Sequence, residues 1–250
     1  MTGSREWKPM MPLQHKVAIV TGGAVRLGRA IVDRLVQRGF RVLLHFDHSE
    51  TEAQQAVQDH GEAVCAVQAN FCEPLQAANR LFDRAREEFG AVDVLINNAA
   101  IFEDQPLDGV DESAWDRHFS INLKAPFFLS QAFSRQHVAG HVAQIVNIAD
   151  WRGTKPGTDH LVYTLTKSAL ITMTQNLAQV LAPEIRVNAI APGAILPPPG
   201  VDQRAFQQQA ATDLLQAPGS PEDVLQALDF LLQSHYITGD TLYVAGGHQL

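Results

Sequence analysis

The sequence contains few cysteines and no metal-binding spacing. Two of its 250 residues are cysteine, Cys65 and Cys72, which is too few for a disulfide scaffold. No cysteines and histidines lie at the spacing of a zinc site, so we expect no metal centre. Cys65 lies in the apolar run 63–67, and we expect its thiol to pack as a small buried hydrophobic group.

Long hydrophobic runs and an excess of basic residues are also missing. No stretch approaches the roughly 18 consecutive apolar residues of a membrane span, and the first residues lack the basic-then-apolar order of a signal peptide. The formal net charge is −8, opposite in sign to a surface that binds nucleic-acid phosphates. We therefore expect a cytoplasmic protein that binds a small molecule, with no nucleic-acid or membrane partner. Residues 1–14 are expected to form a loose, flexible tail.

Linkers, internal repeats and low-complexity tracts are absent as well. Hydrophobic residues make up 46% of the chain, which is enough for one well-buried core at this length. We therefore expect residues 15–250 to form a single domain.

Short apolar runs alternate regularly with helical patterns along the chain. We expect strands over residues 17–20, 41–46, 63–67, 92–96, 144–148, 185–190 and 241–244. Two helix starts are marked by capping residues: Ser49 with Glu52 forms a capping box, and Ser220 precedes a proline. The alternation predicts an α/β fold with a Rossmann-type doubly wound parallel sheet. In such sheets ligands bind beyond the carboxyl ends of the strands.

A glycine-containing turn follows the first expected strand. Residues 21–28, Thr-Gly-Gly-Ala-Val-Arg-Leu-Gly, lead into an amphipathic helix whose apolar face begins at Leu27. Gly22 allows a tight turn and Gly28 lets the helix and strand pack closely. The helix N-terminus then offers backbone N–H groups to a pyrophosphate. A strand on one side and a helix on the other make this turn a predicted dinucleotide-binding site.

The segment Tyr163-Thr164-Leu165-Thr166-Lys167 is the strongest single motif. Positions four apart share one face of a helix. We therefore expect the Lys167 ammonium to lie near the Tyr163 phenol and to lower its pKa from the usual value of about 10. Such a phenol donates or accepts a proton near neutral pH.

These motifs together resemble the short-chain dehydrogenase/reductase family over about residues 15–248. The resemblance implies a proton relay in which Asn122 acts with Tyr163 and Lys167. It also implies further cofactor contacts from four segments: Gly22, Leu27 and Gly28 in the turn, Asn70, the pair Asn98 and Ala99 in Asn-Asn-Ala-Ala, and the pair Pro192 and Gly193.

Three residues depart from or extend the common family pattern in one direction. Arg26 replaces the middle glycine of the turn, and Asp150 replaces the serine that the family carries thirteen residues before the tyrosine. Phe102 lies four residues after Asn98. All three are similar to the pteridine reductase branch. There the arginine faces the pyrophosphate and the pterin, the phenylalanine stacks on the pterin, and the aspartate serves a ring nitrogen.

The second strand ends in residues that bear on cofactor choice. An acidic residue there commonly binds the ribose hydroxyls of NAD, whereas basic or hydroxyl groups accept the 2′-phosphate of NADP. Asp47 lies one position past the usual place of the NAD-selecting aspartate, and His48 and Ser49 follow it. The resemblance favours NADP(H), and NAD(H) stays open as an alternative.

The sequence is therefore interpreted as an NADPH-dependent, pteridine reductase-like enzyme that acts on a dihydropterin or dihydrofolate-like substrate. One alternative is a carbonyl or 3-oxoacyl reductase of the same family, and another is a dinucleotide-sensing binding protein without turnover. The helical regions 111–135 and 161–182 are apolar on more than one side, and relatives assemble through such helices. We therefore expect a homotetramer.

Overall fold

The computed structural model describes residues 16–138, 143–198, 200–211 and 214–250. Their strands form one seven-stranded sheet in the order β3-β2-β1-β4-β5-β6-β7, and every neighbouring pair is parallel. The strands are β1 (Val17–Val20), β2 (Arg41–Phe46), β3 (Val64–Gln68), β4 (Val94–Asn97), β5 (Ala143–Ile148), β6 (Ile185–Pro192) and β7 (Thr241–Val244). The predicted Rossmann-type doubly wound α/β fold is confirmed.

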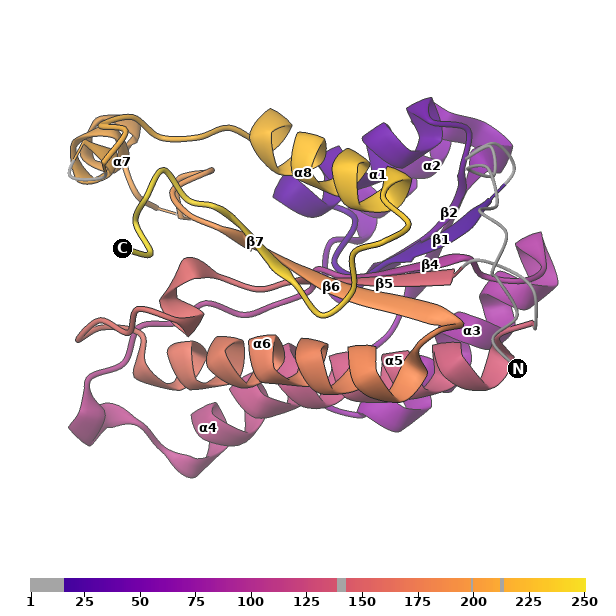
Figure 1. Ribbon diagram of the computed structural model, residues 1–250, viewed down its shortest axis with the longest axis horizontal. Coiled ribbons are helices and arrows are strands. Elements are labelled where there is room, and N and C mark those ends of the chain that lie inside the picture. The colour runs from indigo at the N-terminus through magenta and orange to yellow at the C-terminus, as the bar shows by residue number, and fades with distance from the viewer. Residues whose placement is uncertain (1–15, 139–142, 199, 212–213) are drawn as a thin grey trace, which may run out of the picture.

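Helices cover both faces of this sheet. Figure 1 shows α1, α2 and α8 over one face and α3, α4, α5 and α6 along the other. The helices are α1 (Arg26–Gln37), α2 (Glu50–His60), α3 (Pro74–Phe89), α4 (Glu112–Phe119), α5 (Ala125–Gln136), α6 (Leu161–Leu181), α7 (Gln203–Ala210) and α8 (Pro221–Gln233). Two covered faces explain why the strands are continuous apolar runs rather than alternating ones.

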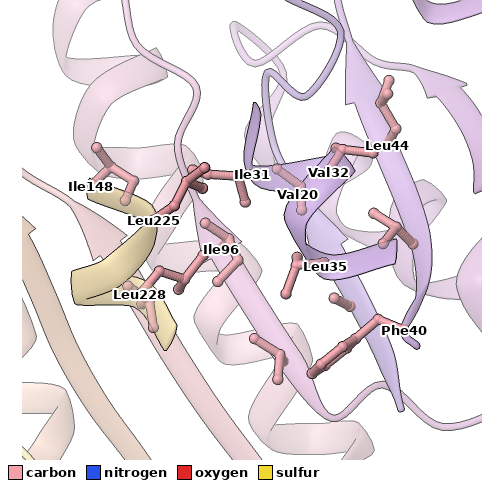
Figure 2. Packing of buried hydrophobic residues seen from close by; sticks show 14 of the residues in the cluster. Val20, Ile31, Val32, Leu35, Phe40, Leu44, Ile96, Ile148, Leu225 and Leu228 are labelled. Atoms are coloured by element: carbon pink, nitrogen blue, oxygen red, sulfur yellow. The ribbon is translucent and has the colours of Figure 1, made fainter. Parts of the chain in front are cut away.

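The first and last long helices pack together over the strands at the centre of the sheet. Figure 2 shows Leu225 and Leu228 of α8 close to Ile31 of α1, above strand residues such as Ile96. All of these side chains belong to one buried cluster. Ion pairs reinforce the contact at the helix surfaces, where Asp229 of α8 lies between two arginines of α1 and its C-cap. Its Oδ2 is 2.5 Å from Arg34 Nη1 and 2.6 Å from Arg38 Nη2.

Two local details, at Ser49 and at Cys65, differ from the sequence-based expectation. Ser49 precedes α2 but makes no capping hydrogen bond, because its backbone, at φ −87° and ψ 58°, lies outside the extended range of a capping residue. The Ser220 cap does form, with Asp223 completing a capping box. Cys65 is half-buried rather than buried, because β3 lies at the edge of the sheet.

The helix α7 was not among the elements expected from the sequence. The predicted tail, residues 1–14, lies outside the described residues. Within the described part of the chain, no helix is both long and apolar enough to cross a membrane. The same part holds no group of three or more His, Cys, Asp or Glu side chains arranged for a metal ion.

Candidate functional site

The sheet reverses its winding direction between β1 and β4, and the predicted site residues gather at the carboxyl ends of these strands. β1 pairs with β2 on one side and with β4 on the other. A cavity of about 310 Å³ opens there. Its lining includes Gly22, Arg26, Leu27, Gly28, Asp47, Asn98 and Ala99, all predicted cofactor contacts. A crevice at such a switch point is where doubly wound sheets bind ligands.

The N-terminus of α1 faces this cavity without a capping side chain. Val25 is the N-cap and makes no side-chain cap hydrogen bond, and the first turn of α1 contains no acidic residue. Free backbone N–H groups and the positive end of the helix dipole are therefore available to an anion. This arrangement fits the pyrophosphate of a dinucleotide.

Two glycines in the turn are required by the backbone. Gly22 has a φ of +60°, a conformation that side chains disfavour. A Cβ atom on Gly28 would overlap the carbonyl oxygen of Gly22, so only glycine allows this close approach of helix and turn. The structure thus gives both glycines the packing roles expected from the motif.

Side chains from two other segments hold the turn in place. The Asn98 amide donates hydrogen bonds to the carbonyl oxygens of Thr21 (2.9 Å) and Gly22 (3.1 Å). In return, the Thr21 hydroxyl oxygen accepts from the backbone N–H groups of Asn98 and Ala99. Asn98 and Ala99 therefore fix the turn from the end of β4.

His45 of β2 holds the turn from the opposite side. Its Nδ1 accepts a hydrogen bond from the Gly22 N–H at 3.1 Å, and its Nε2 lies 3.0 Å from the Ala69 carbonyl oxygen. The ring is stacked on Phe71 with 4.0 Å between centroids. Burial lowers the pKa of His45 to about 4, so the ring is neutral near pH 7.

Arg26 has an unusual backbone and reaches toward Pro197, in the segment that precedes α7. Its φ is +54°, which is consistent with the glycine that relatives carry at this position. Its guanidinium donates a hydrogen bond to the Pro197 carbonyl oxygen at 2.8 Å. Arg26 therefore connects the turn to the segment that leads into α7.

The residues at the end of β2 are arranged around an exposed acidic group. The Asp47 carboxylate lies 3.2 Å from His48 Nδ1, and the His48 side chain is 90% exposed. Asp47 lines the turn cavity and also a neighbouring cavity of about 550 Å³ that Asn70 lines too. Ser49 lies at the start of α2. Asp47 is thus the residue of this group that faces both cavities.

Asp150 and Tyr163 form a hydrogen-bonded pair at the end of β5. The Tyr163 hydroxyl donates to Asp150 Oδ2 at 2.9 Å, and Asp150 Oδ1 accepts from the backbone N–H of Arg152. Burial raises the pKa of the Asp150 carboxyl, against the opposing effects of that backbone N–H and of Lys167. The acid is therefore a better proton donor near neutral pH than an exposed aspartate.

Lys167 lies one turn from Tyr163, as predicted, but its effect on the phenol differs from the expectation. Its Nζ is 5.6 Å from the Tyr163 ring centroid and donates to the Ile148 carbonyl oxygen at 2.7 Å. The pKa of Tyr163 is raised well above its usual value, by burial first and by Asp150 second. The expected lowering of the Tyr163 pKa is wrong, because burial and the neighbouring carboxylate both disfavour a phenolate.

Lys167 and Asn122 occupy fixed positions beside this pair. Burial lowers the pKa of Lys167 to about 8, although Asp150 acts in the opposite direction. Asn122 lies in a π-helical turn over Ser120–Lys124, between α4 and α5. Its side chain bonds both backbone groups of Ile101 and the hydroxyl of Thr166. Such turns frequently occur at functional sites.

Phe102 lies against the helix that carries Tyr163. One face of its ring stacks on His160, with 3.8 Å between centroids, and the Tyr163 ring lies nearly perpendicular to it, with 4.7 Å between centroids. His160 has a φ of +50° and its backbone N–H donates to Asp104. The structure therefore brings Phe102 next to Tyr163, with one face already covered by a residue that the motifs did not indicate.

Pro192 and Gly193 end β6 beside the C-terminal strand. The Gly193 N–H donates to the Val244 carbonyl oxygen at 2.9 Å. A Cβ on Gly193 would press on the backbone of Ala245. The glycine therefore allows this turn to pack tightly against the chain after β7.

Two contacts near the site were not predicted from the sequence. They are the stacking of His160 on Phe102 and the Arg152–Asp159 ion pair, at 2.5 Å, and both join residues from different segments of the chain. His45 did carry a signal, because it is a polar residue inside an apolar strand. A buried polar side chain requires hydrogen-bond partners. The partners of His45 include Gly22, which shows that His45 supports the turn.

Comparisons with known proteins agree with this geometry. The family model described as short chain dehydrogenase matches residues 16–208. A 3-oxoacyl-[acyl-carrier-protein] reductase FabG of Vibrio cholerae is 32% identical over 244 residues, covering 95% of this chain and 98% of the relative. An L-rhamnose 1-dehydrogenase (NAD(P)(+)) of a Sphingomonas species is 33% identical, with the same coverage of both chains.

Solved structures are similar over the same extent. The FolM alternative dihydrofolate reductase 1 of Brucella canis, complexed with NADP, superposes with a TM-score of 0.90 at 32% identity, covering 95% of each chain. The matched family model, the full-length relatives and the shared sheet lead to one conclusion. The chain belongs to the short chain dehydrogenase family of oxidoreductases.

Proposed function

We propose that this protein catalyses the NADPH-dependent reduction of a pterin-like ring, such as that of a dihydropterin or dihydrofolate. The observation that carries the proposal is the half-buried Asp150 carboxyl bonded to the Tyr163 hydroxyl at 2.9 Å. Relatives that reduce ketones carry a neutral serine hydroxyl at this position. A carboxyl group with a raised pKa is suited to protonating a ring nitrogen instead.

In the proposed reaction the substrate gains a hydride on a ring carbon and a proton on the adjacent nitrogen. A bound nicotinamide cofactor supplies the hydride and becomes oxidised. The Asp150–Tyr163 pair supplies the proton, and bulk solvent restores it. The Lys167 ammonium lies over the Tyr163 ring and stabilises the negative charge that remains on the pair after proton transfer. Asn122 fixes the Ile101 backbone and Thr166 beside them.

The cofactor is proposed to be NADP(H). Gly22, Leu27 and Gly28 would hold its pyrophosphate with the N-terminus of α1, and Asn70 would contact its adenine. Pro192 and Gly193 would lie beside its nicotinamide. His48 and Ser49 would accept the 2′-phosphate, and the NADP in the similar Brucella canis structure supports this assignment for the present chain.

Phe102 and Arg26 are proposed to bind the substrate ring. Phe102 is 41% exposed and its ring lies nearly perpendicular to that of Tyr163, so apolar aromatic surface is available next to the proton donor. Stacking of two flat rings is favourable in this geometry. The Arg26 guanidinium donates a hydrogen bond to the Pro197 carbonyl oxygen, and in the proposal it contacts the substrate ring from that side.

A 3-oxoacyl or other carbonyl reductase is the second candidate. The observation that favours it is the 32% identity to the Vibrio cholerae FabG over nearly the whole chain. The same identity links the chain to the Brucella canis FolM dihydrofolate reductase, so overall similarity does not separate the two. Asp150 does separate them, because carbonyl reduction uses a hydroxyl there. A binding protein without turnover would not need the Asp150–Tyr163 pair.

A substitution at Asp150 tests the proposal. Wild-type enzyme is assayed with dihydropterins, dihydrofolate, simple ketones and a 3-oxoacyl thioester, using NADPH and NADH in turn. Asp150→Ser is expected to lower dihydropterin reduction by roughly 100-fold, the scale of a lost acid–base group. Phe102→Ala should mainly raise KM for the pterin, because stacking holds ground state and transition state alike.

The contrary result is equally well defined. Wild-type enzyme that reduces ketones well and dihydropterins not at all, with Asp150→Ser harmless, would replace the proposal with the carbonyl reductase. Turnover of none of the substrates with either cofactor, in protein that binds NADPH, would favour a binding protein.

A further inference from the structure

Beyond the proposed reaction, we infer that His45 is a positioning residue that sets the geometry of the cofactor site by joining its phosphate-binding turn to its adenine-binding segment. This inference rests on the proposed dinucleotide site. His45 lies on β2, 2% exposed, between the turn at Gly22 and the segment Ala69–Phe71 that follows β3. No motif assigns it a role.

The hydrogen bonds determine the protonation state of the ring. Because Gly22 N–H is a donor, His45 Nδ1 must present a lone pair to it. The proton of the neutral ring therefore lies on Nε2, where it is donated to the Ala69 carbonyl oxygen at 3.0 Å. Both ring nitrogens are satisfied in this tautomer. A protonated ring would set an N–H against the Gly22 N–H and break the first bond.

The backbone of His45 holds the same turn. Its carbonyl oxygen accepts a hydrogen bond from Gly23 N–H at 2.9 Å. Two successive amides of the turn are therefore fixed to one residue, one through the side chain and one through the backbone. Gly22 has a φ of +60°, a conformation that glycine adopts readily. Without restraint, the glycine backbone would also adopt many other conformations. His45 thus restricts the part of the chain with the greatest backbone freedom.

The other side of the ring reaches the adenine-binding segment. Besides the bond to Ala69, the imidazole stacks on Phe71 with 13° between the ring planes. The residue between them is Asn70, the proposed adenine contact. A dinucleotide spans both the turn and this segment. A residue that fixes their separation therefore preorganises the site for the whole cofactor.

Two substitutions separate the two contacts. In His45→Asn the side-chain oxygen takes about the place of Nδ1, so the acceptor for Gly22 is kept and the Ala69 contact is lost. In His45→Gln the amide nitrogen takes about the place of Nε2, so the Ala69 contact is kept and the Gly22 acceptor is lost. Ile145→Val is the matched control, because Ile145 is fully buried in β5, a strand that pairs with β4 and β6 and not with β2.

Binding is measured for NADPH and for adenosine 2′-monophosphate, which lacks the pyrophosphate. His45→Gln is expected to raise the Kd of NADPH roughly tenfold, the scale of leaving a buried N–H without its partner, and to change the Kd of the monophosphate by less than twofold. His45→Asn is expected to weaken both ligands. Ile145→Val should lower the melting temperature and leave both Kd values unchanged.

A purely structural role predicts a different result: all three variants would lose melting temperature, and none would lose NADPH affinity at 25 °C. That outcome would overturn the inference. So would a Kd change in His45→Gln that is equal for both ligands. Failure of wild-type protein to bind NADPH or NADH would instead remove the proposed cofactor site, which distinguishes the two failures.

The wild-type tautomer gives a test that does not depend on variants folding. In ¹⁵N-labelled protein at pH 7, the His45 ring is expected to show the neutral Nε2–H form and to shift when NADPH is added. A neutral Nδ1–H form, or a spectrum unchanged by saturating NADPH, would contradict the inference.

Discussion

The two hydrogen bonds of Asp150, one from the Tyr163 hydroxyl and one from the Arg152 backbone, leave the carboxyl with a fixed orientation. Tyr163→Phe removes the first bond and the proposed relay while keeping the ring. We expect hydride-transfer rates to fall by roughly 100-fold or more, with NADPH affinity changed little. Single-turnover rates and fluorescence titration of NADPH measure the two effects. Near-normal turnover would rule out the mechanism.

Lys167 is expected to behave differently from the phenol. We propose that Lys167 also binds the nicotinamide ribose, so Lys167→Ala should lower both the hydride-transfer rate and the affinity for NADPH. Burial lowers the pKa of Lys167 to about 8. In wild-type enzyme, kcat/KM should therefore fall as pH rises through about 8, where the ammonium loses its charge. A flat profile from pH 7 to 9.5 would contradict this role.

The buried ring of His45 makes the stability of the protein depend on pH. Its pKa is about 4 in the fold and 6.5 as the ordinary value, so between these limits the unfolded chain binds a proton that the folded chain does not. The contribution of the neutral His45 ring to the free energy of unfolding is therefore complete above pH 6.5 and declines as the pH falls toward 4. Between pH 7 and pH 5, wild-type protein should lose roughly 2 kcal/mol relative to His45→Gln. Urea unfolding of both proteins at each pH measures the difference, and parallel curves would disprove it.

Residue types in the motifs were predictable, whereas their protonation was not. The spacing of Tyr163 and Lys167 places them on one helical face whatever surrounds them. The pKa of the phenol depends on Asp150 and on burial, both of which come from another segment. The cover that His160 provides for Phe102 likewise depends on a left-handed backbone at the start of α6. Neither condition leaves a local pattern in the sequence.

At the scale of elements, the turn before α1 is connected to the segment before α7 by a single side chain. Arg26→Gly should remove the strain of a left-handed arginine backbone, which stabilises the fold by about 1 kcal/mol. The greater conformational freedom of glycine in the unfolded chain offsets this gain. We expect melting to change little. The bond to Pro197 is lost, however, so backbone hydrogen exchange in residues 194–196, which precede Pro197 and Pro198, should become faster. Unchanged exchange there would show that the tether has no effect.

The end of β2 is expected to control cofactor preference. Asp47 faces both neighbouring cavities, and its charge would repel a 2′-phosphate. Asp47→Ser should raise kcat/KM for NADPH relative to NADH by roughly tenfold, the scale of one removed like-charge contact near a surface. Replacing His48 and Ser49 together by alanine should weaken NADPH far more than NADH. A wild type that prefers NADH would overturn the cofactor proposal.

Elements were predicted more reliably than their ends. The seven strands lie within two residues of their expected limits, because buried parallel strands are unbroken apolar runs. Capping was less predictable: Ser49 and Ser220 both precede helices with an acidic residue three positions on, yet only Ser220 forms the capping box. The difference lies in the backbone of Ser49, which the turn after β2 determines. α7 was missed because it is short and polar, with Phe206 as its one large apolar residue.

At the scale of the whole molecule, one surface of the helical layer exposes large apolar side chains. Trp115, Phe127, Leu161 and Leu165, on α4, α5 and α6, are each about two-fifths exposed. A groove of about 1470 Å³ runs between the same helices. We expect a homotetramer assembled through this face. Light scattering should give four times the chain mass of 27.4 kDa, and Phe127→Glu should lower it. A wild-type monomer at micromolar concentration would contradict the assembly.

The pairing of α1 with α8 has a consequence for how the chain is made. Arg34 and Asp229 are 195 residues apart in sequence, and Leu225 and Leu228 belong to the same buried cluster as Ile31 and Val20. During synthesis on the ribosome, the first strand and helix therefore emerge long before the helix that covers them. Until then their apolar surface stays exposed in the nascent chain, where chaperones that bind such surfaces would find it. Translation of α8 is the step that allows this face of the sheet to close.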